Sequence, residues 1–255
     1  MHIISLINLK GGVGKTTTAI NMSAELAKRG RRVLLIDADQ QHNASDFFGI
    51  TNRTPSLAEV LGGTAALSAA IVHKGNCGVD VVPSSMALAL HDLATIRGDS
   101  IKALSLREQI ATLPYDLTVI DCPPGFSAAS VAALSASDEA IIPTTVDPMA
   151  VSGMMELREQ IKSLRKINGN IAVEVLITIF DRQNAADRQG ADQLRAQKSI
   201  DVFAQSIRHS TKVKQASFRR QTLTVFSPGC GAAVDYRRFV DEWEKRHDVK
   251  GETHG

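Results

Sequence analysis

The chain has 255 residues, of which 44% are hydrophobic and 22% are charged, and its formal net charge is +2. This composition excludes an intrinsically disordered protein, which would be poorer in apolar residues and more unbalanced in charge. A chain of this length can bury a sizeable core. Taken as an average, the near-zero net charge argues against a strongly basic nucleic-acid-binding protein.

Cysteine use and the lack of targeting segments point to the cytoplasm. The three cysteines, Cys77, Cys122 and Cys230, are too scattered for a disulfide framework or a CxxC metal site. The opening residues, MHIISLIN, have no basic region like that of a signal peptide. No apolar run reaches the roughly 18 residues of a membrane span. We therefore expect a soluble cytoplasmic protein without a membrane partner, with a polar tail at about 247–255.

Short apolar runs rich in β-branched residues alternate with helix-like segments. Strands are predicted at 3–8, 33–37, 79–83, 117–121, 140–143, 173–179 and 223–226. Helices are predicted at 16–29, 57–61, 104–113, 127–136, 152–166, 185–198 and 236–245. Because the strands read as continuously apolar, helices should cover both of their faces. We predict one α/β domain over residues 1–255, with a doubly wound, mainly parallel sheet that binds ligands at the carboxyl ends of its strands.

A glycine-rich loop, LKGGVGKTTT from Leu9, lies between the first predicted strand and the first predicted helix. Glycines let successive N–H groups turn toward one anion, and the helix adds its positive N-terminal end. We expect Lys15 to reach the β- and γ-phosphates of a nucleotide and the Thr16 hydroxyl to bind Mg²⁺. Leu9 replaces the first glycine of the ordinary phosphate-loop motif, and Lys10 adds a second cation. The expected cofactor-binding residues are Lys10, Gly11, Gly12, Val13, Gly14, Lys15, Thr16 and Thr17.

Three carboxylates are also expected near this loop, because the carboxyl ends of parallel strands lie at one edge of the sheet, and the loop follows the first strand at that edge. Asp37 and Asp121 end two predicted strands, and Asp39 stands just beyond the first of them. We expect Asp37 and Asp121, with Thr16, to lie at the Mg²⁺ ion, which proteins hold with few carboxylates. Asp39 is expected to orient the attacking water and to act in catalysis with Lys10 and Lys15. The alternative for any one of these acids is a helix cap or a turn.

The stretch KGGVGKTTTAINMSAELAKRGRRVLLIDAD from Lys10 resembles the deviant Walker A family, which includes the ParA/Soj partition ATPases and MinD. The likeness continues through DLTVIDCPPGFSAASVAALSASDEAIIPTTVDP and VLITIFDR to VFAQSIRHSTKVKQA, so it covers nearly the whole chain. It implies a P-loop fold, ATP and Mg²⁺ as cofactors, and a homodimer in the ATP state. In that family, Lys10 matches the lysine that reaches the partner's nucleotide, Asp39 matches the acid that supports hydrolysis, and Asp121 matches the Walker B acid.

Two segments depart from the family pattern. The loop from Asp39 reads DQQHN where relatives usually carry D-P-Q-x-N, so Gln40 replaces a proline that would stiffen it. The segment from Ile207 reads IRHS where relatives often carry I-P-R-N. The resemblance therefore assigns the contacts with adenine to Arg208 and Ser210, and Arg208 could stack on the base.

Basic residues gather in one stretch, at about 202–238, where no acidic residue stands between Asp201 and Asp235. Such a cluster attracts phosphate backbones without reading base sequence. The resemblance implies the same, since the ATP dimers of partition ATPases bind DNA nonspecifically. A solvated surface is the alternative for any single lysine. The candidate DNA-binding residues are Arg208, Lys212, Lys214, Arg219, Arg220, Arg237 and Arg238.

The predicted function is a dimerising ATPase that binds nonspecific DNA and segregates plasmid or chromosomal DNA with a ParB-like centromere-binding partner. Its intrinsic hydrolysis is expected to be weak and partner-stimulated, and its ATP state to be nucleoid-associated. The alternative is a MinD-like positioning ATPase that cycles on a membrane or a protein cargo. A membrane cycle would need a C-terminal amphipathic helix, but after Trp243 the tail offers only Val249 as a bulky apolar residue. A metabolic synthase of the same superfamily would need a substrate pocket that the sequence does not reveal.

Overall fold

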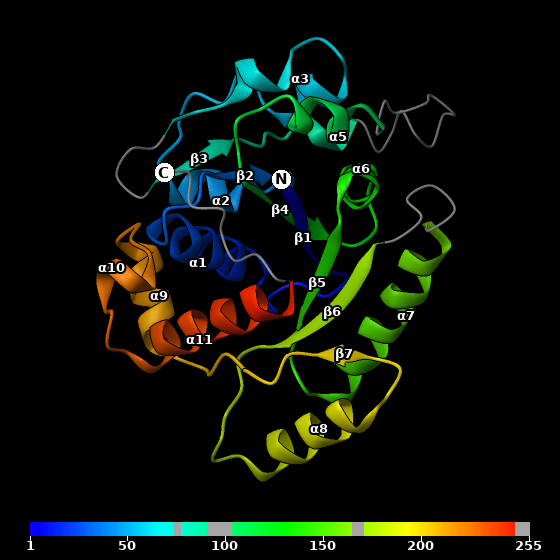
Figure 1. Ribbon diagram of the computed structural model, residues 1–255, viewed down its shortest axis with the longest axis vertical. Helices are drawn as coiled ribbons and strands as arrows, with labels where there is room; N and C mark the ends of the chain where they lie inside the picture. Colours follow the sequence, from blue (N-terminus) through cyan, green and yellow to red (C-terminus); the bar gives the residue numbers. More distant parts are fainter. Residues whose placement is uncertain (74–77, 91–103, 165–170, 248–255) are drawn as a thin grey trace.

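A parallel sheet of seven strands, in the order β3-β2-β4-β1-β5-β6-β7, forms the centre of the structure (Figure 1). The structure is a computed structural model that describes residues 1–73, 78–90, 104–164 and 171–247. Its strands are β1 (His2–Asn8), β2 (Val33–Asp37), β3 (Val79–Val82), β4 (Leu117–Pro124), β5 (Glu139–Thr144), β6 (Ala172–Ile177) and β7 (Asp201–Val202). The parallel pairing confirms the predicted fold class.

Helices cover both faces of the sheet, as expected for strands that are apolar throughout. One face packs against α1 (Lys15–Lys28), α9 (Thr211–Phe218), α10 (Leu223–Phe226) and α11 (Gly231–Arg246). The other face packs against α3 (Leu57–Leu61), η1 (Leu67–Ala70), α5 (Leu104–Ala111), α6 (Ala128–Ala136), α7 (Pro148–Leu164) and α8 (Ala185–Ala196). The short helix α2 (Asn43–Phe47) follows β2.

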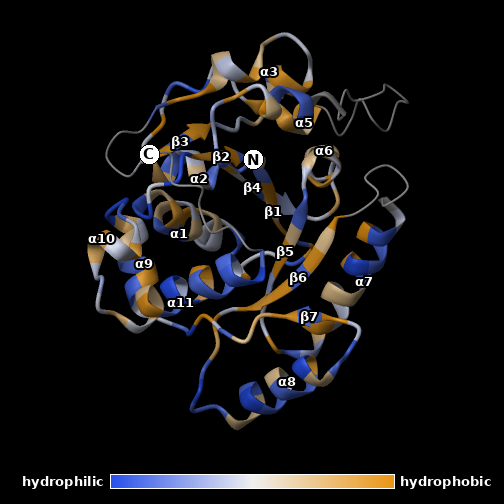
Figure 2. Ribbon diagram, in the orientation of Figure 1, coloured by the Kyte–Doolittle hydropathy of each residue, from blue (hydrophilic) through white to orange (hydrophobic). Residues whose placement is uncertain are grey.

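Successive residues of the strands enter opposite cores. In β2, Leu34 and Ile36 face the core under α3 and α6, whereas Val33 and Leu35 face the core under α1 and α11. Figure 2 shows hydrophobic residues along the central strands and hydrophilic residues on α8 and α11. This burial on two sides explains why the strands lack the alternating pattern of a half-exposed sheet.

The predicted strand at 223–226 is wrong, because these residues form α10. The amide of Phe226 donates to the Thr222 carbonyl at 2.8 Å, and the amide of Leu223 donates to Asn21 Oδ1 at 2.9 Å. The helical turn and α1 thus satisfy the backbone, and the segment packs in the helical layer, away from the sheet edges β3 and β7. The sequence prediction also missed α2, α9, η1 and β7, which are short or have weak periodicity.

The structure covers part of what the sequence predicts about membrane spans, cysteines and the polar tail. In the described ranges no helix is long and apolar enough to cross a membrane. Cys122 is buried and Cys230 is partly buried, and both are free thiols. Cys77 and residues 248–255 of the predicted polar tail lie outside the described residues.

Candidate functional site

The glycine-rich loop joins the end of β1 to the start of α1. Gly12 and Gly14 have positive φ angles of 76° and 87°, a region where a side chain would be strained. Gly14 is the N-cap residue of α1, and no side chain caps the helix there. The first N–H groups of α1 therefore remain available for an anion at a helix terminus with positive partial charge.

Neighbouring strands hold this loop in place. Asn8 donates from Nδ2 to the Pro143 carbonyl at 2.8 Å, and its Oδ1 accepts from the amide of Lys10 at 3.0 Å. On the other side, the Thr178 hydroxyl donates to the Val13 carbonyl at 2.7 Å. These contacts tie the loop to the ends of β5 and β6, so its conformation does not depend on a ligand alone.

Lys15 projects inward and is only 7% exposed. Its ammonium donates to the Lys10 carbonyl at 3.0 Å, which bends the side chain back over the loop. Burial lowers the pKa of Lys15, while the nearby carboxylates of Asp121 and Asp39 oppose that shift. The arrangement places a partly desolvated cation beside the free N–H groups of α1, as a phosphate group would require.

Asp121 is a buried carboxylate near Lys15 and Thr16. It lies opposite Asp37 in the register of β2 and β4, and its side chain is fully buried. Among the described residues neither of its carboxylate oxygens has a hydrogen-bond partner. Burial, reinforced by the charge of Asp37, raises the pKa of Asp121 well above its usual range, and the Thr16 side chain partly offsets that rise. An orphan carboxylate next to a threonine hydroxyl fits a hard cation such as Mg²⁺.

Asp37 organises the loop that follows β2. Its Oδ2 accepts from the amide and the hydroxyl of Ser45 at 2.8 and 2.7 Å, and its Oδ1 accepts from the amide of Asp39 at 3.2 Å. Burial raises the pKa of Asp37 to about 6 despite these hydrogen bonds. The expected metal residue Asp37 thus has both oxygens engaged with the loop that carries Asp39.

Asp39 lies at the mouth of this site. Its Oδ1 accepts from the amide of Gln41 at 2.9 Å, and the residue is 6% exposed. In the described ranges, Asp37, Asp39 and Asp121 do not bring three carboxylate oxygens within 4.8 Å of one another. The three acids therefore do not form one compact set of ligands in this arrangement.

A cleft of about 1060 Å³ adjoins the loop. The phosphate-loop side of its wall includes Lys15, Thr16 and Asp39. The opposite side includes Arg208 and Ser210, so the structure brings the predicted phosphate and base positions to one cleft. Residues that the sequence prediction did not assign to this wall also line it: Asn21, Gln41, Asp46, Thr178 and Tyr236. Of these, Tyr236 bonds through its hydroxyl to Thr18 of α1 at 3.1 Å.

Arg208 is held by an internal ion pair. Its Nε donates to Asp235 Oδ2 at 2.7 Å and its Nη2 donates to Asp235 Oδ1 at 2.8 Å, a two-point contact with a fully buried carboxylate. The Ser210 hydroxyl caps α9 by accepting from the amide of Lys212 at 3.2 Å. Both predicted base-contact residues therefore line the cleft while already holding partners inside the protein.

Lys10 lies beside the cleft and pairs with an acid that sequence reasoning missed. Its ammonium is 3.1 Å from Asp147 Oδ2, and both side chains are nearly half exposed. Hydrogen bonds from Thr145, followed by those from the Ala150 amide and Lys10, lower the pKa of Asp147 to about 2. Lys10 and Asp147 lie 137 positions apart in sequence, and only the adjacency of β1 and β5 brings them together.

The remaining basic candidates differ in exposure and in whether they line the cleft. Lys214 and Arg220 line the cleft. Lys212, Arg219 and Arg238 are exposed and lie outside its lining. Arg237 is partly buried and donates to the Pro228 carbonyl at 2.8 Å.

Comparisons with known proteins match these features. Residues 1–175 match a family profile described as an AAA domain. The chain is 32% identical over 250 residues to the chromosome partitioning protein ParA of Caulobacter vibrioides, covering 95% of this chain and 93% of that protein. It is 32% identical over 243 residues to the chromosome-partitioning ATPase Soj of Thermus thermophilus, covering 94% of each. Cobyrinic acid a,c-diamide synthase from Mycobacterium smegmatis, solved with ADP and magnesium, has a TM-score of 0.82 and 25% identity, covering 99% of this chain and 97% of that one.

Proposed function

Because this chain belongs to the ParA/Soj-type family of P-loop ATPases, we propose that it hydrolyses ATP with Mg²⁺ in order to segregate plasmid or chromosomal DNA. The observation that carries the proposal is the orphan carboxylate of Asp121 beside the phosphate loop and Lys15. The reaction is in-line attack of water on the γ-phosphate, which gives ADP and phosphate. The intrinsic rate is weak, and a ParB-like centromere-binding partner stimulates it.

The residues of the loop position the phosphates and balance their charge. The N–H groups of α1 and the ammonium of Lys15 bind the phosphate oxygens, and both act where negative charge grows during transfer. Thr16 and Asp121 would hold Mg²⁺, whose role is to neutralise phosphate charge. Asp39 orients the water, and Asp37 fixes the loop that carries Asp39.

The ATP state of the proposed enzyme is a homodimer in which Lys10 contacts the partner's nucleotide. In the structure Lys10 pairs with Asp147 of its own chain instead. Dimer formation would therefore require Lys10 to leave Asp147. Because both side chains are nearly half exposed, this pair contributes only about 0.2–1 kcal/mol, and its loss is a small obstacle.

We expect Asp147→Asn to strengthen the ATP-dependent dimer by at most about 30-fold, because each of the two subunits no longer has to break a Lys10–Asp147 pair worth at most about 1 kcal/mol. Asparagine can still accept from the amide of Ala150, so the start of α7 is preserved. Sedimentation with a non-hydrolysable ATP analogue measures the dissociation constant. Asp116→Asn is the matched control, since Asp116 forms an exposed pair with Arg32 elsewhere. A weaker dimer in Asp147→Asn alone would contradict the competition between Asp147 and the partner.

The proposed DNA surface consists of Lys212, Arg219 and Arg238, which are exposed and outside the cleft. Arg208 is left out because Asp235 holds it. Phosphate contacts of this kind bind DNA of any sequence and weaken as salt rises. Two subunits joined by ATP double the number of contacts, so DNA binding should depend on ATP, and the ATP form should associate with the nucleoid.

Reversing two of these charges tests the surface. We expect Lys212→Glu/Arg219→Glu to lower affinity for random-sequence duplex DNA and to reduce the salt slope by about 4, since each phosphate contact contributes about 1 and the ATP dimer carries both changes in each of its two subunits. Fluorescence anisotropy with ATP and Mg²⁺ between 50 and 200 mM salt measures both. The control Lys28→Glu/Arg32→Glu carries the same charge change on another exposed surface.

The DNA and ATPase parts of the proposal can fail separately. If the unmodified protein hydrolyses ATP but does not bind DNA at low salt, the DNA function is wrong and the ATPase function stands. Sedimentation with anionic liposomes under the same conditions would then favour the MinD-like alternative.

A further inference from the structure

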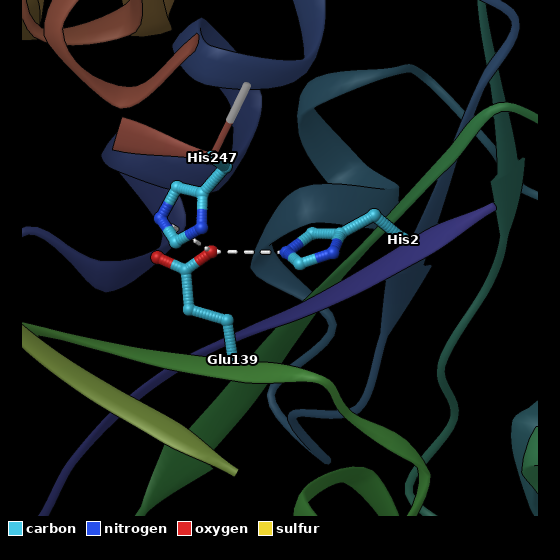
Figure 3. Close-up of side chains that lie close together, drawn as sticks. All are labelled: His2, Glu139 and His247. Carbon is cyan, nitrogen blue, oxygen red and sulfur yellow. Dashed lines mark hydrogen bonds and ion pairs between the residues drawn. The ribbon is translucent and has the colours of Figure 1, made fainter. Parts of the chain in front are cut away.

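A second group of ionisable side chains, which includes His2, Glu139 and His247 (Figure 3), lies toward the amino ends of the central strands, whereas the phosphate loop follows the carboxyl end of β1. His2 begins β1, Glu139 begins β5 and His247 directly follows α11. Glu174, in β6, faces the same ring of His247. The nucleotide mechanism uses none of these four residues, and residues from three neighbouring strands and one helix meet here.

The spacing of these side chains matches that of metal ligands. Among the described residues, His2, Glu139 and His247 are the group whose possible ligand atoms all lie within 4.8 Å of one another. The distance from Glu139 Oε2 to His2 Nε2 is 3.2 Å and that to His247 Nε2 is 3.5 Å, while His247 Nε2 lies 2.9 Å from Glu174 Oε2. Around a tetrahedral Zn²⁺, bonds of about 2.0–2.1 Å separate neighbouring ligand atoms by about 3.3 Å.

The charges at this group favour a cation. The side chain of Glu139 is fully buried, and its Oε1 has no hydrogen-bond partner in the part of the chain that the structure describes. Glu174, which is 6% exposed, adds a second carboxylate beside it, so two carboxylates meet at this group.

Outer contacts hold the four side chains in orientation. The indole N–H of Trp243 donates to Glu139 Oε2 at 2.8 Å. Arg246 donates to Glu174 Oε1 at 2.7 Å, which leaves Oε2 toward His247. Such contacts commonly orient metal ligands. The side chains of His2 and His247 are 27% and 18% exposed, so an ion can enter from solvent.

We propose that His2, Glu139 and His247, with Glu174 beside His247, form a binding site for a divalent transition-metal ion of the Zn²⁺ type. Two imidazoles with a carboxylate suit Zn²⁺, Fe²⁺ or Co²⁺, whereas Mg²⁺ prefers oxygen ligands alone. A bound ion would fasten the end of α11 to β1, β5 and β6. Because α11 also carries Asp235 and Tyr236, the ion would stabilise the helix that supports the far wall of the nucleotide cleft.

Co²⁺ titration of the untagged full chain tests the site. We expect one ion per chain, with the intense visible absorption bands of tetrahedral Co²⁺, and competition by Zn²⁺ but not by millimolar Mg²⁺. His2→Ala and His247→Ala should each lower Co²⁺ affinity at least tenfold. His73→Ala is the matched control, because His73 is exposed and pairs with Asp80 away from this group.

The thermal stability of the unmodified protein gives a second readout that needs no variant. Zn²⁺ should raise its melting temperature, because an ion that binds only the folded state stabilises that state, and His247→Ala should lose this rise while still binding ATP. If the unmodified protein binds no Co²⁺, or if both histidine variants bind it as the unmodified protein does, the proposal is wrong. If the variants do not fold, the Co²⁺ spectrum of the unmodified protein and the change in its melting temperature with Zn²⁺ decide whether the metal site exists.

Discussion

Replacing Lys15 by alanine should abolish ATP binding at micromolar nucleotide, a loss of at least about 100-fold in affinity. The reason is that Lys15 is a buried cation, bent over the loop by the Lys10 carbonyl, and hydrogen bonds to charged groups are each worth about 1.5–3 kcal/mol. Its removal also deprives Asp121 of its nearest opposing charge. Fluorescence titration with a labelled ATP analogue at submicromolar protein measures the loss.

Lys10→Ala is the matched control for Lys15→Ala, because it removes a lysine from the same loop. Lys10 is exposed and paired with Asp147, so its loss should leave nucleotide affinity within about twofold and weaken only the ATP-dependent dimer. Circular dichroism should show that both variants fold. Equal loss of ATP affinity in the two variants would count against separate roles for these lysines.

The sheet and the phosphate loop could be predicted because local signals determine them. The run VLLID at Val33–Asp37 is buried on both faces, and its boundaries agree with the observed strand. Gly12 and Gly14 have the positive φ angles that the loop pattern implies. Asp37 and Asp121 share a register position in the parallel pair of β2 and β4, although β4 continues to Pro124, beyond its predicted end at Asp121. The strand, the loop conformation and the position of the two acids are therefore determined by residues that are close in sequence or that occupy equivalent places in parallel strands.

Partners that are far apart in sequence could not be predicted. Arg208 lines the cleft, and its ion pair with Asp235, which ends the acid-free stretch, is not visible in the sequence. The pairing of Lys10 with Asp147 and the meeting of His2 with His247 depend on strand order, which the residues alone do not display. The net charge of +2 likewise averages cations that are paired, such as Arg208, with cations that are exposed, such as Arg219, and the fold distinguishes the two kinds.

Replacing Asp39 by alanine should slow ATP hydrolysis by about 100-fold or more while leaving ATP affinity nearly unchanged. Asp39 lines the cleft together with Lys15 and Thr16, and its proposed role is to orient water, since a positioned acid or base contributes about 10²–10⁴-fold. Steady-state phosphate release gives the rate, and titration with the labelled analogue gives the affinity. Since hydrolysis ends the ATP state, the variant should also remain longer as a dimer on DNA.

Asp46→Ala is the matched control for Asp39→Ala, because Asp46 lines the same cleft but is half exposed and pairs with Arg53 and His42. It should hydrolyse ATP at nearly the normal rate. Asp39 also accepts from the amide of Gln41, so Asp39→Asn keeps that contact and removes only the charge. Slow hydrolysis in both Asp39 variants would assign the effect to the carboxylate, whereas normal hydrolysis in Asp39→Asn would assign it to the shape of the loop that Asp37 and Ser45 hold.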